Sequence, residues 1–151
     1  MSLIEERDSL LVECRRIVDD RIAKAQAELK SFSEQSGEET KSSAGDKYET
    51  ARAMLHLEKE KTAVQLTESI KLKKVLDQIG HGSTNSGLGK LLVTNQGKFF
   101  ISVSLGMVNS NGEKYFVLSP VAPLGKIFTQ AKQGQAVEFN GKKYEVLEVL
   151  S

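Results

Sequence analysis

Two long stretches without glycine or proline constrain this fold most. From Ile4 to Phe32, apolar or small residues recur at steps of mostly three and four positions, the spacing that places side chains on one face of an α-helix. A second stretch, from about Lys47 to Ile79, repeats the stripe more loosely. The polar segment between them, 33–45, carries both glycines of the first 79 residues, so we expect the chain to reverse there. The sequence therefore predicts an antiparallel coiled-coil hairpin over residues 1–79, with its acidic tip near 33–49.

The composition changes after the second stretch. Residues 80–89 hold four glycines among small polar side chains, a composition typical of linkers. Beyond them come short runs rich in β-branched and aromatic residues, for which we expect strands; they lie at 91–94, 99–104, 115–118, 136–139 and 144–150. Asn-Gly pairs at 111–112 and 140–141 favour tight hairpins, so antiparallel pairing is expected. We predict a linker at 80–90 and a separate domain at 91–151.

One helix should interrupt these strands. The segment from about Leu124 to Lys132 follows Ser119-Pro-Val-Ala-Pro123 and ends before Gly134, which is the punctuation expected of a short inserted helix. With this helix, the second half is predicted to be a small α+β domain.

Composition and charge narrow the class of protein. The chain is 39% hydrophobic and 27% charged, as globular proteins are. Its first residues do not have the basic-then-apolar order of a secretory signal, and no segment approaches the roughly 20 apolar residues of a membrane span. Cys14 is the single cysteine and excludes an intrachain disulfide; we expect it to be a small buried hydrophobe. A cytoplasmic location without membrane contact is expected.

Several kinds of site are disfavoured. A net charge of +1 argues against strong sequence-independent binding of duplex nucleic acid, which needs a concentrated basic face. Residues 82–90 fail the phosphate-loop spacing, because Thr84 stands where a glycine is required and Leu91 follows Lys90. His56 and His81, the two histidines, make a poor metal site or catalytic base. Autonomous catalysis is not expected, and a protein partner is the first expectation.

The start of the second helix carries the most informative motif, Gly45-Asp46-Lys47-Tyr48-Glu49-Thr50-Ala51. Spacing alone favours a capping role, with Asp46 as N-cap and Glu49 three residues later. A second interpretation rests on location. Five acids gather near the predicted turn, namely Glu34, Glu38, Glu39, Asp46 and Glu49, so a long hairpin would present carboxylates at its tip.

The Gly-Asp-x-x-Glu-x-Ala motif at the turn of a helical hairpin resembles the tip of the bacterial transcript-cleavage factors GreA and GreB. Three later segments are similar to the C-terminal domain of the same family, namely Ser119-Pro-Val-Ala-Pro-Leu-Gly125-Lys126, Gly134-Gln-Ala-Val137 and Tyr144-Glu-Val146. The resemblance thus covers both halves in the same order.

The resemblance implies a fold and a function. The C-terminal domain would be an FKBP-like antiparallel sheet with a short helix, docking at the rim of the RNA polymerase secondary channel through Ser119, Pro120, Leu124 and Gly125. The hairpin would reach the polymerase active site, where the carboxylates of Asp46 and Glu49 assist catalysis by holding Mg²⁺ or its water. The polymerase remains the enzyme, and the chain alone holds no tight Mg²⁺. The implied protein is a monomeric regulator of transcription elongation that meets the 3′ end of the nascent RNA, with DNA binding among its associated properties.

Two departures from the family's tip keep other functions open. Thr50 stands where the family commonly has Asn, and Arg52 stands where it often has an aromatic residue. The first alternative is therefore a Gre-like regulator that enters the channel without stimulating cleavage. The second is a helical-hairpin adaptor or chaperone. Prolyl isomerase activity is not expected, since such sites are aromatic-rich pockets and the chain has no tryptophan.

Overall fold

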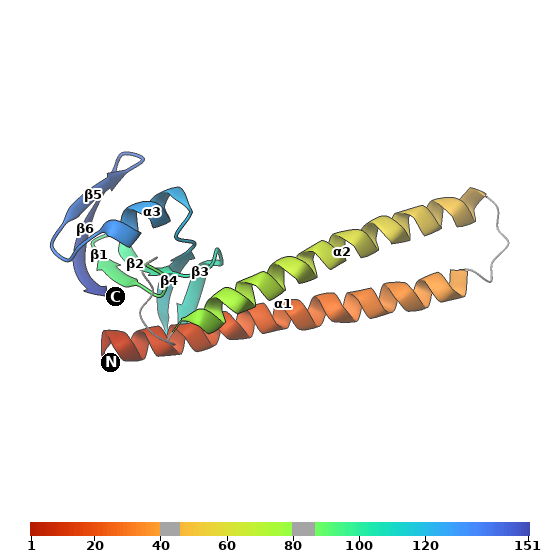
Figure 1. Ribbon diagram of the computed structural model, residues 1–151, viewed down its shortest axis with the longest axis horizontal. Coiled ribbons are helices and arrows are strands. Elements are labelled where there is room, and N and C mark those ends of the chain that lie inside the picture. The colour runs from red at the N-terminus through yellow and green to blue at the C-terminus, as the bar shows by residue number, and fades with distance from the viewer. Residues whose placement is uncertain (40–45, 80–86) are drawn as a thin grey trace. The chain divides into compact units, whose positions relative to one another are not determined.

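A computed structural model describes residues 1–39, 46–79 and 87–151, except for the side chains of 36–39 and 46–48 (Figure 1). Its N-terminal part is the predicted antiparallel hairpin, built from α1 (Leu3–Glu39) and α2 (Asp46–Gln78). α1 runs beyond its expected end at Phe32, because the polar residues that follow include Glu34 and Gln35, which favour helix without belonging to an apolar stripe. The centre of the predicted turn, 40–45, lies outside the described residues.

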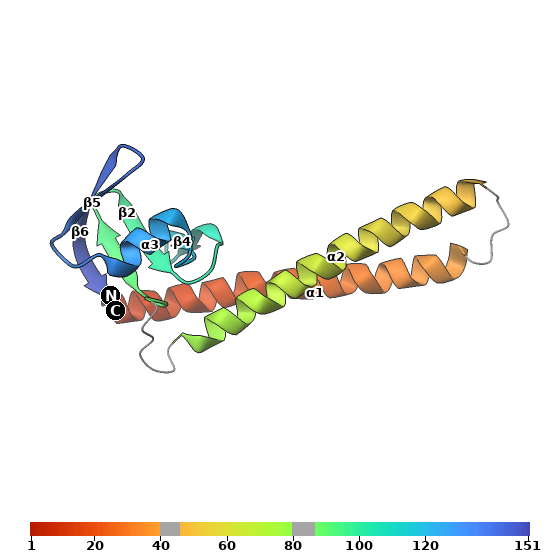
Figure 2. The ribbon, with the colours of Figure 1, turned by 45° about the horizontal axis from the view of Figure 1, so that its top comes forward.

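The C-terminal part confirms the α+β class. Its elements are β1 (Leu91–Thr94), β2 (Gly97–Ile101), β3 (Gly106–Ser110), β4 (Glu113–Leu118), α3 (Pro123–Gln130), β5 (Ala136–Phe139) and β6 (Lys142–Leu150). The six strands form one sheet in the order β3-β4-β2-β1-β6-β5; Figure 1 labels all six strands, and Figure 2 shows the same part of the chain from another side. Four neighbouring pairs are antiparallel as expected, but β2 and β4 are parallel, so the sheet is mixed. The parallel pair arises because β3 lies outside β4 at the edge, and β4 then pairs beside β2.

The Asn-Gly pairs form the predicted tight turns. Asn111 and Asn140 both have φ of 52°, and each is followed by a glycine with φ of 78°. Two successive positive φ values match the twist of the flanking strands. These turns join β3 to β4 and β5 to β6.

β6 contains a bulge. Val93 pairs with Glu148 whereas Thr94 pairs with Val146, so Leu147 is an extra residue without a partner on β1. The extra residue shifts the alternation of side chains by one position. As a result Val149 packs against the same core as Val146.

The described chain divides into two compact units, residues 1–16 with 74–151, and residues 17–73. In the first unit, one face of the sheet packs against α3 through a core that contains Leu92, Phe99, Ile101, Leu118, Phe128, Tyr144 and Val146. Three aromatic rings lie at its centre, with 4.7 Å between the ring centroids of Phe99 and Phe128. On the other face of the sheet, side chains of the same strands are also buried, among them Leu91, Phe100 and Val117.

The first turns of α1 are bound to that second face. Lys98 Nζ donates to Glu6 Oε1 at 2.5 Å, and Tyr115 OH donates to the same oxygen at 2.8 Å. Lys98 and Tyr115 are register partners on β2 and β4, in the same phase as Phe100 and Val117. Both faces of the sheet are therefore covered within this unit.

The second unit, residues 17–73, contains the rest of α1 and most of α2. Val18, Ala25, Thr62 and Ser69 are buried there, so small and polar side chains occupy much of the contact between its two helices. In the described part of the chain, no helix combines the length and the apolar character needed to cross a membrane. The predicted domains at 1–79 and 91–151 stay a prediction, as does the linker at 80–90, most of which lies outside the described residues.

Candidate functional site

The predicted tip carboxylates lie at the beginning of α2. Asp46 is the first residue of this helix, and its side chain lies outside the described part. Glu49 follows one turn later and is exposed. Both the capping role and the metal-holding role of this pair stay predictions.

Glu49 lines a groove of about 470 Å³ in the second unit. The groove is formed by Phe32 of α1 and, on α2, by Glu49, Arg52, Ala53, Leu55, His56 and Lys59. Arg52, His56 and Lys59 follow at helical spacing, and His56 Nε2 lies 3.0 Å from Glu60 Oε1. Within the described ranges, no three His, Cys, Asp or Glu side chains are grouped as metal ligands would be. Because Arg52, His56 and Lys59 line the groove with Glu49, the surroundings of Glu49 are mainly basic. Such surroundings suit an anion better than a metal cation.

The segment from Ser119 to Gly125 connects β4 to α3 and has a clear structural role. Ser119 Oγ accepts a hydrogen bond from Val121 N at 3.2 Å, and Ser119 O accepts one from Ala122 N at 3.1 Å. Gly125 is buried, and a Cβ atom there would lie 2.0 Å from Ser119 O. The Ser-Pro-x-x-x-x-Gly spacing is therefore required to seat the first turn of α3 against the preceding chain.

Leu124, one of the predicted partner-binding residues, lines a cleft. The cleft has a volume of about 430 Å³ and is almost wholly apolar, with Phe116, Pro123 and Phe139 among its other walls. Phe116 is 40% exposed. The cleft could accept an apolar side chain of a partner. Ser119, Pro120 and Gly125 do not line it.

Phe116 and Phe139 were not among the site residues predicted from the sequence. Phe116 belongs to the strand predicted at 115–118, and successive residues of a strand point to opposite faces of the sheet. This alternation does not tell which phase meets α3, because both phases are apolar.

A charged cluster with no local sequence signal lies under the sheet. Lys98 contacts both Glu6 and Glu113, and Tyr115 OH also donates to Glu113 Oε2 at 3.3 Å. Burial opposes the charge of Glu6, but hydrogen bonds from Lys98 and Tyr115 outweigh it and lower the Glu6 pKa. Burial and the two carboxylates raise the pKa of Tyr115. Because Tyr115 holds its proton tightly, the cluster serves attachment better than proton transfer.

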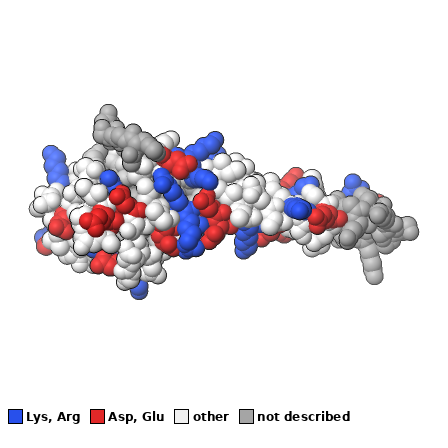
Figure 3. Space-filling model, turned by 90° about the horizontal axis from the view of Figure 1, so that it is seen from below, with Lys and Arg blue, Asp and Glu red and all other residues white. Residues whose placement is uncertain are grey.

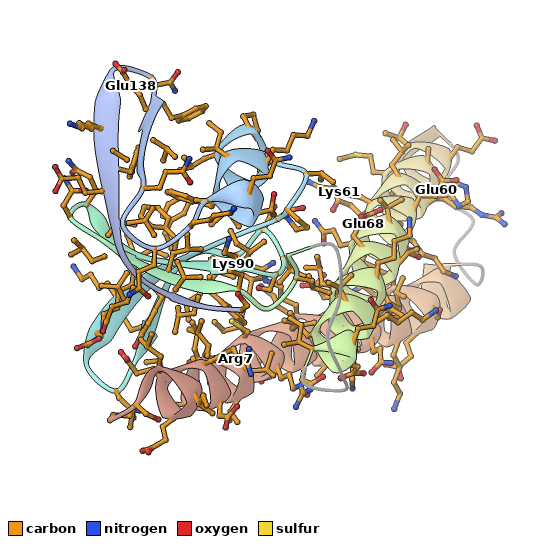
Figure 4. All side chains as sticks on the ribbon, turned by 60° about the vertical axis from the view of Figure 1, so that its left-hand side comes forward. Arg7, Glu60, Lys61, Glu68, Lys90 and Glu138 are labelled. Atoms are coloured by element: carbon orange, nitrogen blue, oxygen red, sulfur yellow. The ribbon has the colours of Figure 1, made fainter. Side chains whose placement is uncertain are left out.

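Lys90 and Cys14 are two further buried groups with reactive side chains. Lys90 Nζ donates to Ala131 O at 2.5 Å and to Thr129 O at 3.2 Å, at the end of α3 (Figure 4). Burial lowers the pKa of Lys90, and its contacts attach the start of β1 to α3. Burial raises the pKa of Cys14 to about 12, so its thiol stays protonated and is no nucleophile. The expectation that Cys14 is a small buried residue is confirmed.

Acidic and basic side chains are interspersed over the face drawn in Figure 3. That face carries no broad basic surface for the phosphates of a nucleic-acid duplex. No model of a known protein family, no curated protein and no solved structure matches the chain.

Proposed function

We propose that the chain is an RNA polymerase-binding elongation factor that enters the secondary channel and stimulates cleavage of backtracked nascent RNA. The observation that carries the proposal is the hairpin of helices with 37 and 33 residues, in which Asp46 and Glu49 of the Gre-like motif belong to the first residues of α2. At about 1.5 Å per residue, the shorter helix extends about 50 Å, enough to bring a carboxylate deep into a channel. The proposed protein works in the cytoplasm as a monomer.

The proposed chemistry belongs to the polymerase. Water attacks a phosphodiester phosphorus of the displaced RNA, and the 3′ oxygen of the preceding nucleotide leaves. Asp46 and Glu49 would supply oxygen ligands to a weakly held Mg²⁺ and orient the attacking water. The chain contributes positioning and charge, and it has no catalytic activity of its own.

The C-terminal domain would supply most of the binding energy. The apolar cleft beside Leu124 gives it a surface on which a partner could bury an apolar side chain. Ser119, Pro120 and Gly125 would contribute by holding the start of α3, which supports Leu124.

Cleavage of RNA in a stalled, backtracked polymerase complex tests this function. We expect wild-type protein to accelerate cleavage. Asp46→Asn or Glu49→Gln should lower this acceleration by a factor of about 10² or more. Glu58→Gln is the matched control, because Glu58 is exposed on the same helix and does not line the groove beside Glu49. Full acceleration by both tip variants would overturn the proposed role of the carboxylates.

A regulator that occupies the channel without stimulating cleavage is the second candidate. It is favoured by the basic groove, in which Arg52 and Lys59 lie with Glu49 and compete with Mg²⁺ for its carboxylate. Under this candidate, wild-type protein binds core polymerase but gives no more cleavage than buffer. Thr50→Asn combined with Arg52→Phe should then create cleavage activity. Failure to bind core polymerase at all would leave the adaptor or chaperone function.

A further inference from the structure

α2 is apolar on the side where a hairpin helix is expected to be polar. Met54 and Leu57 are each 63% exposed and Val64 is 61% exposed, whereas Thr62 and Ser69 are 3% and 7% exposed. With Lys61, the three apolar residues recur at steps of three and four, so they lie along one side of the helix. We call these four residues the outer stripe. Single exposed apolar residues are ordinary, but an aligned set is typical of an interaction surface.

The outer stripe adjoins a groove between the two helices of the second unit. This side groove has a volume of about 420 Å³, and Val64 belongs to both features. Its apolar floor is completed by Ala25 and Leu72, and its rim carries Arg21, Lys24, Glu28, Gln65 and Glu68. Figure 4 shows Lys61 and Glu68 along the same side of α2. Together the stripe and groove resemble the seat that two helices offer to a third.

The charges of this surface are unequally engaged. Glu28 Oε2 accepts a hydrogen bond from Thr62 Oγ1 at 3.5 Å, and Glu68 Oε1 lies 3.6 Å from Lys71 Nζ. By contrast, the side chains of Arg21, Lys24 and Lys61 make no hydrogen bond or ion pair among residues 1–39, 46–79 and 87–151. The uncommitted charge beside the apolar surface is therefore positive, which favours an acidic partner.

A second copy of the chain fits this surface poorly. In a parallel pairing of two outer stripes, Lys61 would face Lys61 of the other copy. Like charges in such positions oppose association.

We propose that the outer stripe and side groove bind an amphipathic helix of a partner protein, with apolar residues on one face and acidic residues along its edges. The span from Met54 to Leu72 corresponds to about 27 Å of helix, so a partner helix of about 18 residues would cover it. This binding does not use Asp46 or Glu49 and is independent of the proposed cleavage function.

A synthetic helix tests the proposal with the full chain. The probe is a labelled peptide of about 20 residues with leucine on one face and glutamate along both edges; a matched peptide carries lysine instead. Fluorescence anisotropy should detect binding of the glutamate peptide and at least about tenfold weaker binding of the lysine peptide, since tenfold corresponds to one well-placed charge interaction. Equal binding of the two peptides would overturn the charge assignment.

Variants identify the surface. Leu57→Glu with Val64→Glu should weaken binding of the glutamate peptide by about tenfold or more, because both residues belong to the outer stripe. Since both residues are exposed, the change leaves the buried contact of the hairpin intact. Arg21→Glu with Lys24→Glu should weaken it similarly, and the lysine peptide should restore it. Lys30→Glu with Lys74→Glu is the matched control, since these exposed lysines do not line the side groove.

Other outcomes have clear meanings. Undiminished binding to the Leu57 and Val64 variant, with helical content retained by circular dichroism, would place the peptide elsewhere and reject the proposal. A third outcome would assign the surface to a second copy of the chain: the wild-type protein binds neither peptide, its molecular mass in solution increases with concentration, and the Leu57 and Val64 variant shows no such increase. Asp46→Asn with Glu49→Gln should bind the peptide normally, which separates this test from that of the cleavage function.

Discussion

Among the glycines that the structure describes, Gly125 is the one at which an added Cβ atom would lie closest to a neighbouring atom. A Cβ atom at this position would lie 2.0 Å from Ser119 O, which is backbone and cannot turn away. We expect Gly125→Ala to lower the free energy of unfolding by about 3 kcal/mol, at the upper end for added atoms in a packed interior. Urea unfolding followed by circular dichroism measures the change.

The control for Gly125 is Gln130→Ala on the same helix. Gln130 is exposed, so its replacement should change the free energy of unfolding by no more than about 0.5 kcal/mol. Equal stability of Gly125→Ala and wild type would mean that the start of α3 can move away from Ser119 without cost.

Glu6 gives the stability of the protein a dependence on acid pH. Its pKa in the folded chain lies below the ordinary 4.5, since hydrogen bonds from Lys98 and Tyr115 outweigh burial. The stabilisation from this carboxylate is therefore fully present above pH 4.5 and is lost as pH falls through the lower, folded-state pKa. Glu6→Gln should be less stable than wild type at pH 7, by about 1–3 kcal/mol, and the difference should shrink below pH 4.5.

Glu13→Gln is a useful comparison for Glu6. Its hydrogen bond with Arg16 also lowers its pKa, but the pair joins neighbours on one helix and is in water. Chemical denaturation from pH 3 to pH 7 should show a smaller dependence for this pair. A difference between wild type and Glu6→Gln that stays constant over this range would contradict the argument.

At the scale of elements, α3 is held to the sheet mainly by Phe128. Its ring lies 4.7 Å from the ring centroid of Phe99 and 5.5 Å from that of Tyr144, and it is fully buried. Phe128→Ala should cost about 3–5 kcal/mol in the free energy of unfolding. The same replacement should accelerate amide hydrogen exchange in α3. Val121 is 73% exposed, so Val121→Ala should change neither the free energy of unfolding nor the exchange rate.

Most elements were predictable from local signals, but β3 (Gly106–Ser110) was not predicted, and the strand predicted at 99–104 is β2 (Gly97–Ile101). The Asn-Gly turns needed positive φ, and Pro123 marked the first turn of α3. The predicted end of α1, at Phe32, was wrong because Glu34 and Gln35 continue the helix without adding to its apolar stripe. The parallel pairing of β2 with β4 could not be predicted, since strand order depends on contacts between residues distant in sequence.

For the whole molecule, we expect the two compact units to differ in local stability. β1 and β2 have neighbours on both sides and bury Leu91, Leu92 and Phe100 completely, whereas the middle of α2 is packed through Thr62 and Ser69. Hydrogen exchange should therefore be about two orders of magnitude slower for amides of β1 and β2 than for residues 50–70. Equal protection in both would show that the hairpin is as stable as the sheet.

The candidate site was less predictable than the fold. Asp46 and Glu49 came from a resemblance, and their roles stay predictions. The basic residues beside Glu49 follow from helical spacing, but the position of Phe32 in the same groove requires the hairpin. The contacts of Glu6 with Lys98 and Tyr115 join residues about a hundred positions apart, which no local pattern encodes.

The bulge in β6 has a consequence for the length of the chain. Because Val146 pairs with Thr94 and Glu148 with Val93, removal of Leu147 would leave a regular ladder with every other partner unchanged. We expect this single-residue deletion to fold, with cross-strand amide contacts between Leu91 and Leu150 retained in nuclear magnetic resonance spectra. Deletion of Val146 instead would remove a fully buried core side chain. A sequence one residue shorter here would thus be aligned with its gap at Leu147.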